Sequence, residues 1–430
     1  MTETRPRFFY GWWVVVTAAL GLFLGHIPIV VFSFGVFLRP LTQEFHSGRG
    51  AVSLAFTLHG AIVALGMPFA GRLVDRFGAR KVILPSASMV GLILLSSYFC
   101  SGRIWHLYVF YLALGFAGCG EAPVSYCDVI SHWFDRYRGF ALGLMMLGLG
   151  LGALIMPAIV QYLIARFGWR VTFGIAGAVI LFFTVPVVAR FLKERPESMG
   201  LLPDGDPYPV SGSAKPNADV GLSWGEAWRA PIFWVLFCAF ILVAASVQGC
   251  LAHIAAILAD RGVPAHAAAL ASSLFGGGLL VGRTGSGYLL DRFFAPRVAA
   301  VIFGCAAAGI GLLRIASSQE LAFAAAFVIG IGLGAEVDIM AYLTSRYFGL
   351  RSFGTIYGFI FAGFGLAGGV GAYLMGAAFD AAGSYALALG LFCIGTFIGA
   401  ALMLRLGPYR YQKRPTAEGG PELKILPSEA

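Results

Sequence analysis

One basic side chain stands deep inside an otherwise apolar stretch of the sequence. Arg283 lies within Ala267–Leu290, which contains no other Lys, Arg, Asp or Glu. A guanidinium stays ionised, and its planar fork pairs with a carboxylate through two hydrogen bonds. Because a charge is costly in an apolar environment, this position predicts a binding site for an anion that carries a carboxylate. The alternative is a permanent structural ion pair with Glu336 or Asp338.

Two acidic residues, Glu336 and Asp338, lie in another apolar stretch. Two steps along an α-helix turn the side chain by roughly 200°, so the two carboxyl groups should face different surroundings. Asp338, Tyr342 and Arg346 are four residues apart and share one face. We expect Asp338 to be the counter-ion of Arg283, with Glu336 as the second candidate. An acid displaced from Arg283 by a substrate can take up a proton, whereas a fixed packing charge cannot.

A third set of polar side chains follows one predicted helix. Glu121, Ser125, Asp128 and His132 are spaced 4, 3 and 4 residues apart, which predicts one polar stripe on an apolar helix. Glu121 and Asp128 are therefore further candidates for proton coupling. Asp128 lies near the inner end of the stretch, so a role in an intracellular gate is the alternative.

Hydroxyl-bearing and aromatic side chains complete the candidate binding site. We expect Tyr126, Tyr342 and Tyr357 to supply hydroxyl groups, and Phe361 and Phe32 to form part of an apolar wall. Aromatic residues more often fill a core than line a binding site, so packing is the competing interpretation.

Three histidines lie in apolar stretches: His26, His59 and His253. A lone histidine in such a place is more often a packing residue than a proton carrier. We keep His253 as a weaker candidate for proton coupling, because imidazole titrates near neutral pH.

The composition indicates which kind of structure must position these residues. Of 430 residues, 59% are hydrophobic and 12% are charged, with a mean hydropathy of +0.82. Soluble proteins carry about a quarter charged residues, so a soluble enzyme is excluded. The 58 glycines are typical of packed membrane helices.

Apolar runs of about 20 residues, the length that crosses a bilayer as a helix, recur along the whole chain. The sequence predicts an all-α membrane protein with twelve transmembrane helices at Gly11–Leu38, Ala51–Gly71, Val82–Ser101, Leu107–His132, Phe140–Ala165, Val171–Leu192, Pro231–Leu258, Ala267–Leu290, Val298–Ala316, Leu321–Ser345, Phe353–Phe379 and Tyr385–Leu404.

The distribution of charge predicts the orientation. With both termini inside, most of the 30 Lys and Arg residues fall on inner segments, as the positive-inside rule requires. The net charge of +9 therefore needs no nucleic-acid partner. We expect a multi-pass protein of the cell (inner) membrane whose first helix is not cleaved.

No cofactor, metal or nucleotide site is expected. The seven cysteines form no CxxC motif and fall in or beside predicted helices, which is typical of buried apolar residues. The segment Gly277–Thr284 resembles a phosphate-binding loop, but it lies inside an apolar helix with no preceding strand.

The chain divides into two halves that repeat each other. We expect a six-helix half at residues 1–192, a Pro-rich cytoplasmic linker at 193–230, a second six-helix half at 231–406 and a cytoplasmic tail at 407–430. The segment Gly71–Lys81 follows the second helix, and Gly287–Arg297 follows the eighth with Gly, Leu, Asp, Arg, Phe and Ala in register. Repeated halves of this kind are typical of secondary transporters.

The segment Gly71–Lys81 resembles the signature GxLxDRxGxRK of major facilitator transporters. The resemblance implies two six-helix halves that work by alternating access, driven by gradients and without enzymatic activity. It also implies a gating role for charged residues of the two loop motifs, which are Asp75, Arg76, Arg80, Asp291 and Arg292.

A narrower resemblance links the sequence to the monocarboxylate transporter and oxalate/formate antiporter group. It rests on Gly11-Trp12-Trp13-Val14, on Trp133-Phe134 with the following glycine-rich helix, and on Gly168-Trp169-Arg170. It implies transport of a small carboxylate such as lactate or pyruvate, usually with a proton. In the monocarboxylate family an arginine of the eighth helix holds the substrate, and Arg283 matches that position.

The sequence departs from this group at three places. Leu279 stands where many monocarboxylate transporters have an Asp, and Phe32 stands where they often have a Lys. The run Phe353–Phe379 lacks the Lys of the oxalate-type relatives. One binding cation suits a monocarboxylate better than oxalate, and the proton-coupling residue must lie elsewhere.

Other functions remain open at this point. The Gly- and Pro-containing fifth helix also suits an antiporter that exports an amphipathic or larger organic anion. A receptor that binds without transport, or an enzyme, has no supporting constellation in the sequence. We expect the small carboxylate, a proton and the lipid bilayer as partners, and a monomer.

Overall fold

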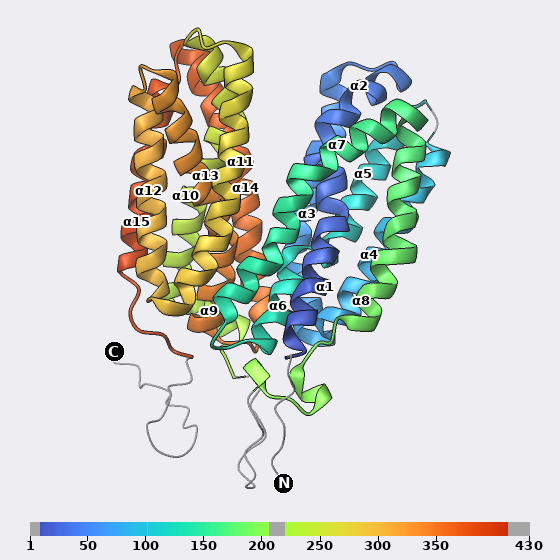
Figure 1. Cartoon of the computed structure of the whole chain (residues 1–430), viewed down its shortest axis with the longest axis vertical. Coiled ribbons are helices and arrows are strands. Elements are labelled where there is room, and N and C mark those ends of the chain that lie inside the picture. The colour runs from blue at the N-terminus through green and yellow to red at the C-terminus, as the bar shows by residue number, and fades with distance from the viewer. Residues whose placement is uncertain (1–8, 101, 206–219, 412–430) are drawn as a thin grey trace. The chain divides into compact units, whose positions relative to one another are not determined.

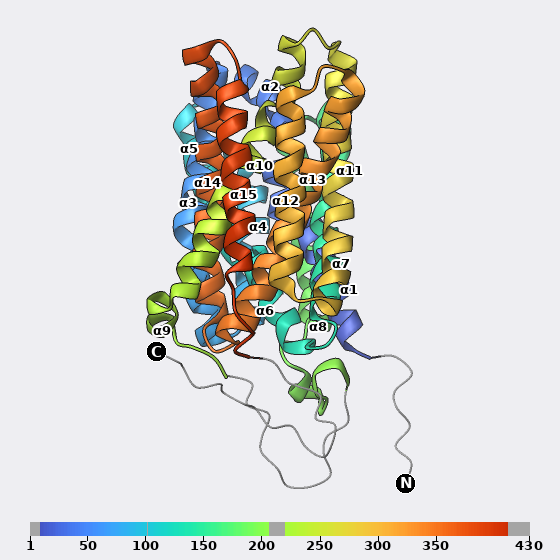
Figure 2. The same ribbon diagram turned by 90° about the vertical axis from the view of Figure 1, so that its left-hand side faces the viewer.

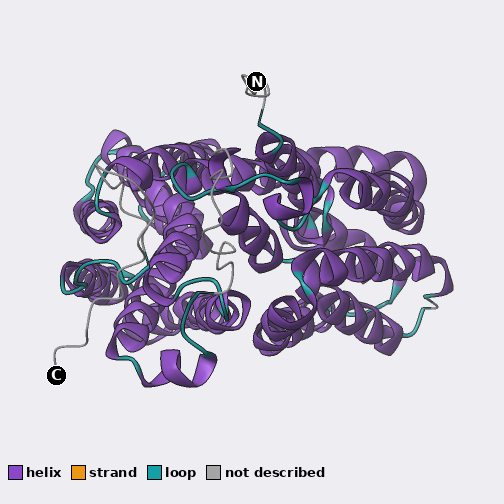
Figure 3. Ribbon diagram, turned by 90° about the horizontal axis from the view of Figure 1, so that it is seen from below, coloured by secondary structure: helices purple, strands orange, loops and turns teal. Residues whose placement is uncertain are grey.

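The computed structural model of the chain describes residues 9–100, 102–205 and 220–411. The chain divides into two compact units, Met1–Ser213 and Ala214–Ala430. Within each unit the helices run side by side as a bundle (Figure 1). In the described residues helices and loops make up the fold, with one isolated bridge between Gly221 and Gly349 (Figure 3). The centre of the predicted linker and the tail beyond Tyr411 lie outside these residues.

Unit 1 contains the predicted helices one to six. Its described elements are α1 (Gly11–Leu24), η1 (Ile27–Phe32), α2 (Phe34–Glu44), α3 (Arg49–Phe77), α4 (Ala79–Leu95), η2 (Ser96–Phe99), α5 (Ile104–Gly118), η3 (Cys119–Glu121), α6 (Pro123–Trp133), α7 (Arg138–Val179), η4 (Ile180–Thr184), α8 (Val185–Phe191), η5 (Pro196–Met199) and η6 (Pro203–Gly205).

Unit 2 contains the predicted helices seven to twelve. Its described elements are α9 (Trp224–Arg229), α10 (Pro231–Asp260), α11 (Ala265–Arg292), α12 (Ala295–Ile315), α13 (Gln319–Phe348), α14 (Phe353–Ala382) and α15 (Ala386–Leu404).

The twelve predicted spans correspond to these elements. Ten described segments are long and apolar enough to cross a membrane, and one of them, Arg138–Phe191, holds two spans. It turns at Gly168, whose φ of 78° is a left-handed value that favours glycine. The eighth span is α11, which has the length but contains Arg283 and several glycines and serines. These residues lower the mean hydropathy of α11. A buried polar site needs such a charged residue and small residues that allow close packing.

Two spans that we predicted as continuous helices are interrupted. The first changes at Gly25 from α1 to the π-helical η1. The fourth changes at η3 and Ala122, whose extended backbone (ψ 161°) separates α5 from α6. The single polar stripe expected from Glu121 to His132 is therefore broken after its first residue. Proline explains part of the break, since Pro123 favours the first turn of a new helix and an extended residue before it.

Glycines bring α11 and α13 into backbone contact. A Cβ at Gly278 or Gly282 would overlap a carbonyl oxygen of α13, and a Cβ at Gly330 or Gly334 would overlap one of α11. The two helices are neighbours along their length (Figure 2). Small residues four apart allow such close approach, so the repeated spacing on both helices sets their register.

One end of unit 1 is held by Arg170. Its guanidinium donates to Oε1 of Glu44 at 2.7 Å and to the carbonyl of Cys100 at 2.8 Å, and it lies 4.4 Å from the Trp169 ring centre. The side chain therefore ties together the ends of the first, third and sixth spans.

At the opposite, predicted cytoplasmic end, two hydrogen bonds hold the segment after α15 against other helices of unit 2. Tyr347 donates its hydroxyl to the carbonyl of Gly407 at 2.5 Å, and the Tyr409 hydroxyl accepts from the amide of Ala295 at 2.7 Å. These bonds fix the segment after α15 against α12 and α13.

Gly282→Ala tests the seam between α11 and α13. The added methyl group would force the backbones apart, and overpacking of this kind costs about 1 to 3 kcal/mol. We expect a lower thermal unfolding midpoint in detergent. The matched control is Gly285→Ala on the same helix, where a Cβ meets nothing within 4 Å and alanine favours the helix by about 1 kcal/mol. Equal midpoints for the two variants would contradict the seam.

Titration of Glu44 tests the Arg170 contacts. The hydrogen bond from Arg170 lowers the pKa of Glu44 below its usual value. A lowered pKa stabilises the fold above the unfolded value and loses this effect as the pH falls through the folded value. We expect Glu44→Gln to lower the unfolding midpoint slightly at neutral pH, with a difference below about 1 kcal/mol, and to match the wild type in acid. A difference that persists in acid would contradict this account.

Candidate functional site

The buried charges of unit 2 meet between α11 and α13. Arg283 is 6% exposed, Asp338 is 1% exposed, and the two interact electrostatically. Ser286 lies beside the carboxyl group, but its hydroxyl donates to the carbonyl of Arg283 at 3.2 Å. Arg283 is thus the charged partner that compensates the charge of Asp338. The close packing of α11 on α13 at their glycines places the two side chains at the same level along the helices.

The spacing of four residues predicts that Tyr342 and Arg346 lie on the same face of α13 as Asp338. Tyr342 and Arg346 are both buried, and the Arg346 guanidinium lies 5.1 Å from the Tyr342 ring centre. Glu336 is fully buried, and its carboxylate oxygens have no hydrogen-bond partner in the described part of the chain. Unit 2 therefore holds one carboxyl beside an arginine and a second without one.

The predicted aromatic residues take different positions. Tyr357 is fully buried in a row of rings on α14, 5.9 Å from Phe361, which is half-buried. In unit 1 Tyr126 is fully buried and packs its hydroxyl against Gly21. Phe32, by contrast, is 41% exposed at the end of η1, so burial does not distinguish it as a wall residue.

The two acidic residues of the fourth span have different partners. Glu121 lies 3.5 Å from Nδ1 of His26 on the first span. Asp128 lies 3.6 Å from Nδ1 of His132 one turn along α6, and the carbonyl of Asp128 is nearer to that nitrogen, at 2.8 Å. From the sequence we predicted no role for His26 in transport. The Gly25-His26 step followed by Pro28 was the available sign of a helix break there.

His253 is held by ordinary packing contacts. Its Nε2 donates to the carbonyl of Ala372 at 3.0 Å, and its Nδ1 lies 3.4 Å from the Tyr385 hydroxyl. Both ring nitrogens therefore have a partner within unit 2.

The predicted gating residues lie at the ends of α3, α4 and α11. Arg80 donates to the carbonyl of Ala189, and the guanidinium groups of Arg76 and Arg292 lie over Phe77 and Tyr288. Asp75 and Asp291 are half-buried. Asp75, Arg76 and Arg80 belong to unit 1, whereas Asp291 and Arg292 belong to unit 2.

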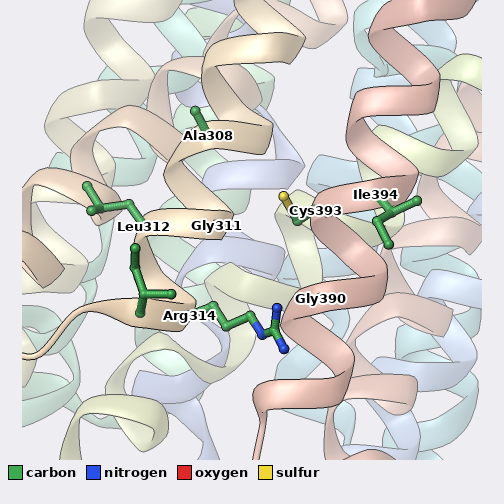
Figure 4. Close-up of a pocket in the computed structure, with 8 residues that line it drawn as sticks. Ala308, Gly311, Leu312, Arg314, Gly390, Cys393 and Ile394 are labelled. Carbon is green, nitrogen blue, oxygen red and sulfur yellow. The ribbon is translucent and has the colours of Figure 1, made fainter.

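Two grooves on the units contain none of the candidate residues. One of about 530 Å³ lies between α12 and α15, with Arg314 as its charged residue (Figure 4). The other, of about 340 Å³, lies between α1 and α7 and is lined by apolar residues and Gly148. Among the described residues no group of three His, Cys, Asp or Glu is arranged to hold a metal ion.

A double-mutant cycle tests the pair in unit 2. Arg283→Gln or Asp338→Asn leaves one buried charge without its counterpart, which costs about 3 to 5 kcal/mol. We expect each single variant to lower the thermal unfolding midpoint and the double variant to recover much of the loss. Purely additive effects would mean that the two charges are not coupled.

Comparison with known proteins agrees with this architecture. The Major Facilitator Superfamily model matches residues 14–372 and 252–429. Human monocarboxylate transporter 11 is 29% identical over 346 residues, covering 77% of this chain and 69% of that protein. The oxalate:formate antiporter of Oxalobacter formigenes is 27% identical over 366 residues, covering 82% of this chain and 81% of that protein.

A solved structure gives the same result for the fold. The E. coli fucose:proton symporter FucP matches with a TM-score of 0.66 at 14% identity, over 92% of this chain and 98% of that one. The family model spans nearly the whole chain, and the helices form the corresponding fold. The chain therefore belongs to the Major Facilitator Superfamily and is a multi-pass membrane transporter, not an enzyme.

Proposed function

We propose that the protein transports a small monocarboxylate such as lactate or pyruvate together with a proton. The observation that carries the proposal is the buried pair of Arg283 and Asp338. A buried guanidinium with a carboxylate partner can accept a substrate carboxylate in its place, because the two anions have the same planar geometry. The similarity to monocarboxylate transporter 11 and to the oxalate:formate antiporter supports a carboxylate as the substrate.

The exchange of partners couples the substrate to a proton. In the empty protein Arg283 and Asp338 neutralise each other. When the substrate carboxylate binds Arg283, Asp338 loses its counter-charge in a buried place and takes up a proton, because an isolated buried carboxylate is costly. Glu336 is the alternative proton carrier on the same helix.

Arg283 is the cation that we assign to the substrate, and one binding cation favours a monocarboxylate. In α14, Phe353–Ala382, the sequence has no Lys or Arg, so this helix supplies no second cation for a dicarboxylate. The hydroxyl groups of Tyr342 and Tyr357 and the ring of Phe361, which all belong to unit 2, would then contact the rest of the substrate.

The two halves of the chain provide the conformational change that transport requires. Residues 1–192 and 231–406 act as the two halves of an alternating-access cycle, joined by a cytoplasmic linker. Both termini lie in the cytoplasm, and the charged loop residues after α3 and α11 close the inner side. The protein acts as a monomer in the cell membrane.

Uptake of radiolabelled lactate into proteoliposomes tests this function. We expect an inward proton gradient to stimulate uptake by the wild type. Arg283→Ala should abolish uptake and Arg283→Lys should reduce it strongly, since an ammonium group does not reproduce the bidentate fork. The matched control is Arg314→Ala, which removes an exposed arginine from another helix and should leave uptake unchanged.

Two results would contradict the proposal. If a folded wild type takes up neither lactate nor pyruvate, export of an amphipathic or larger organic anion by antiport becomes the better assignment. If Arg283→Ala retains wild-type uptake, the arginine has a structural role and another group binds the substrate.

A further inference from the structure

A second buried pair of titratable side chains lies in unit 1. Nδ1 of His26 is 3.5 Å from Oε2 of Glu121, and the two side chains are 2% and 1% exposed. Neither carboxylate oxygen of Glu121 has a hydrogen-bond partner in the described part of the chain. A permanent buried ion pair needs such hydrogen bonds to offset the cost of leaving water. The pair therefore lacks the features of a purely structural salt bridge.

Both residues lie where a membrane helix is interrupted. His26 follows the extended Gly25 at the junction of α1 with the π-helical η1. Glu121 is the last residue of η3 and precedes the extended Ala122. π-Helical turns are frequent at functional sites, and interrupted membrane helices form ion sites in transporters, because their main-chain groups lack the regular helical partners.

Two glycines make room for this contact. A Cβ at Gly118 would lie 2.5 Å from Nε2 of His26, and a Cβ at Gly25 would lie 2.9 Å from Oε1 of Glu121. Each titratable side chain thus packs on a glycine of the opposite span. Two interrupted spans with reciprocal glycine contacts form a built site and not a chance approach of two side chains.

The other titratable side chains around the pair are a histidine, two tyrosines and a cysteine. His59 from α3 has its ring centre 5.9 Å from that of His26, and it contacts Tyr111 from α5. Cys119 in η3 directs its thiol to the carbonyl of Gly115, and Tyr126 from α6 interacts electrostatically with Glu121.

The neighbouring α4 and α7 add no charge at this place. Ser86 of α4 packs against Gly120, and the glycines of α7 pack on the first span. In the described part of the chain Glu121 has no salt bridge with a Lys or Arg, and no cluster of three metal-binding residues is present. A proton is therefore the ligand that this site suits.

We propose that the His26–Glu121 pair is a proton-binding site of unit 1, separate from Asp338, and that its proton crosses the membrane with the substrate. With one proton the pair is neutral, either as imidazole with carboxylic acid or as imidazolium with carboxylate. Without that proton a net negative charge stays buried, which is unfavourable until water reaches the site. No bond of the substrate changes in this step.

Infrared difference spectroscopy tests the proton site without any substrate. The full chain in lipid nanodiscs is moved between acidic and alkaline buffer, and the C=O stretching band of protonated carboxylic acids is followed. We expect Glu121→Gln to remove a titrating band that Asp338→Asn retains. His26→Gln should displace the midpoint of this band, whereas His46→Asn, which changes an exposed histidine, should leave it in place.

Two spectroscopic results would overturn the proposal. One is a set of titrating bands that is identical in the wild type and in Glu121→Gln. The other is a Glu121 band that shifts when Na⁺ replaces K⁺ at constant pH, since this would assign the site to a metal cation. His26→Gln keeps the proposal testable if Glu121→Gln fails to fold.

Transport assays then test whether this proton is carried, a step that rests on the proposed function. The steady-state accumulation ratio of a carboxylate depends on the number of coupled protons, while exchange of labelled for unlabelled substrate does not. We expect Glu121→Gln to lower the accumulation ratio of lactate under a proton gradient and to leave exchange at the wild-type rate. An unchanged ratio, or lost exchange in a folded variant, would overturn the coupling role.

The two proposals fail in distinguishable ways. A titrating Glu121 band in a wild type that transports no carboxylate would retain the proton site and reject the carboxylate function. Proton-driven lactate uptake that is equal in the wild type and Glu121→Gln would do the reverse.

Discussion

The close backbone contact between α11 and α13 is the constraint on which the candidate site of unit 2 depends. Gly278 and Gly282 of α11 pack on the carbonyl oxygens of Phe327 and Ile331. Gly330 and Gly334 of α13 pack on the carbonyl oxygens of Phe275 and Leu279. No side chain separates the two backbones at these levels, so the register between the helices is fixed. Arg283 directly follows one of these glycines, and its position beside Asp338 is a result of that register.

The buried carboxyl groups of Asp338 in unit 2 and Glu121 in unit 1 have different kinds of partner. Unit 2 uses two uninterrupted helices and a permanent cation, and Asp338 is compensated by Arg283. Unit 1 uses two interrupted spans, and Glu121 faces an imidazole, which can be neutral or charged. A chain that repeats its loop motifs in both halves therefore does not repeat its buried chemistry.

The sequence was sufficient to predict the fold because bilayer length and hydropathy leave few alternatives. The facing of Asp338 and Tyr342 on one side of α13 also followed from helical periodicity. The His26–Glu121 contact was not predicted, because it depends on breaks in two spans that hydropathy does not reveal. Gly25 and Pro28 are the sequence signal for the first of these breaks. The role of His253 stays a prediction based on residue type, since its contacts with Ala372 and Tyr385 describe its packing and not its protonation.

The segment after α15 has a consequence for the order in which unit 2 is completed. Tyr347 bonds to Gly407, and Tyr409 accepts from the amide of Ala295 at the start of α12. Residues that follow α15 thus contact helices that were synthesised much earlier. During translation, α12 and α13 must remain without these contacts until Tyr409 has left the ribosome, so unit 2 reaches its full set of contacts only after all of its helices have been synthesised.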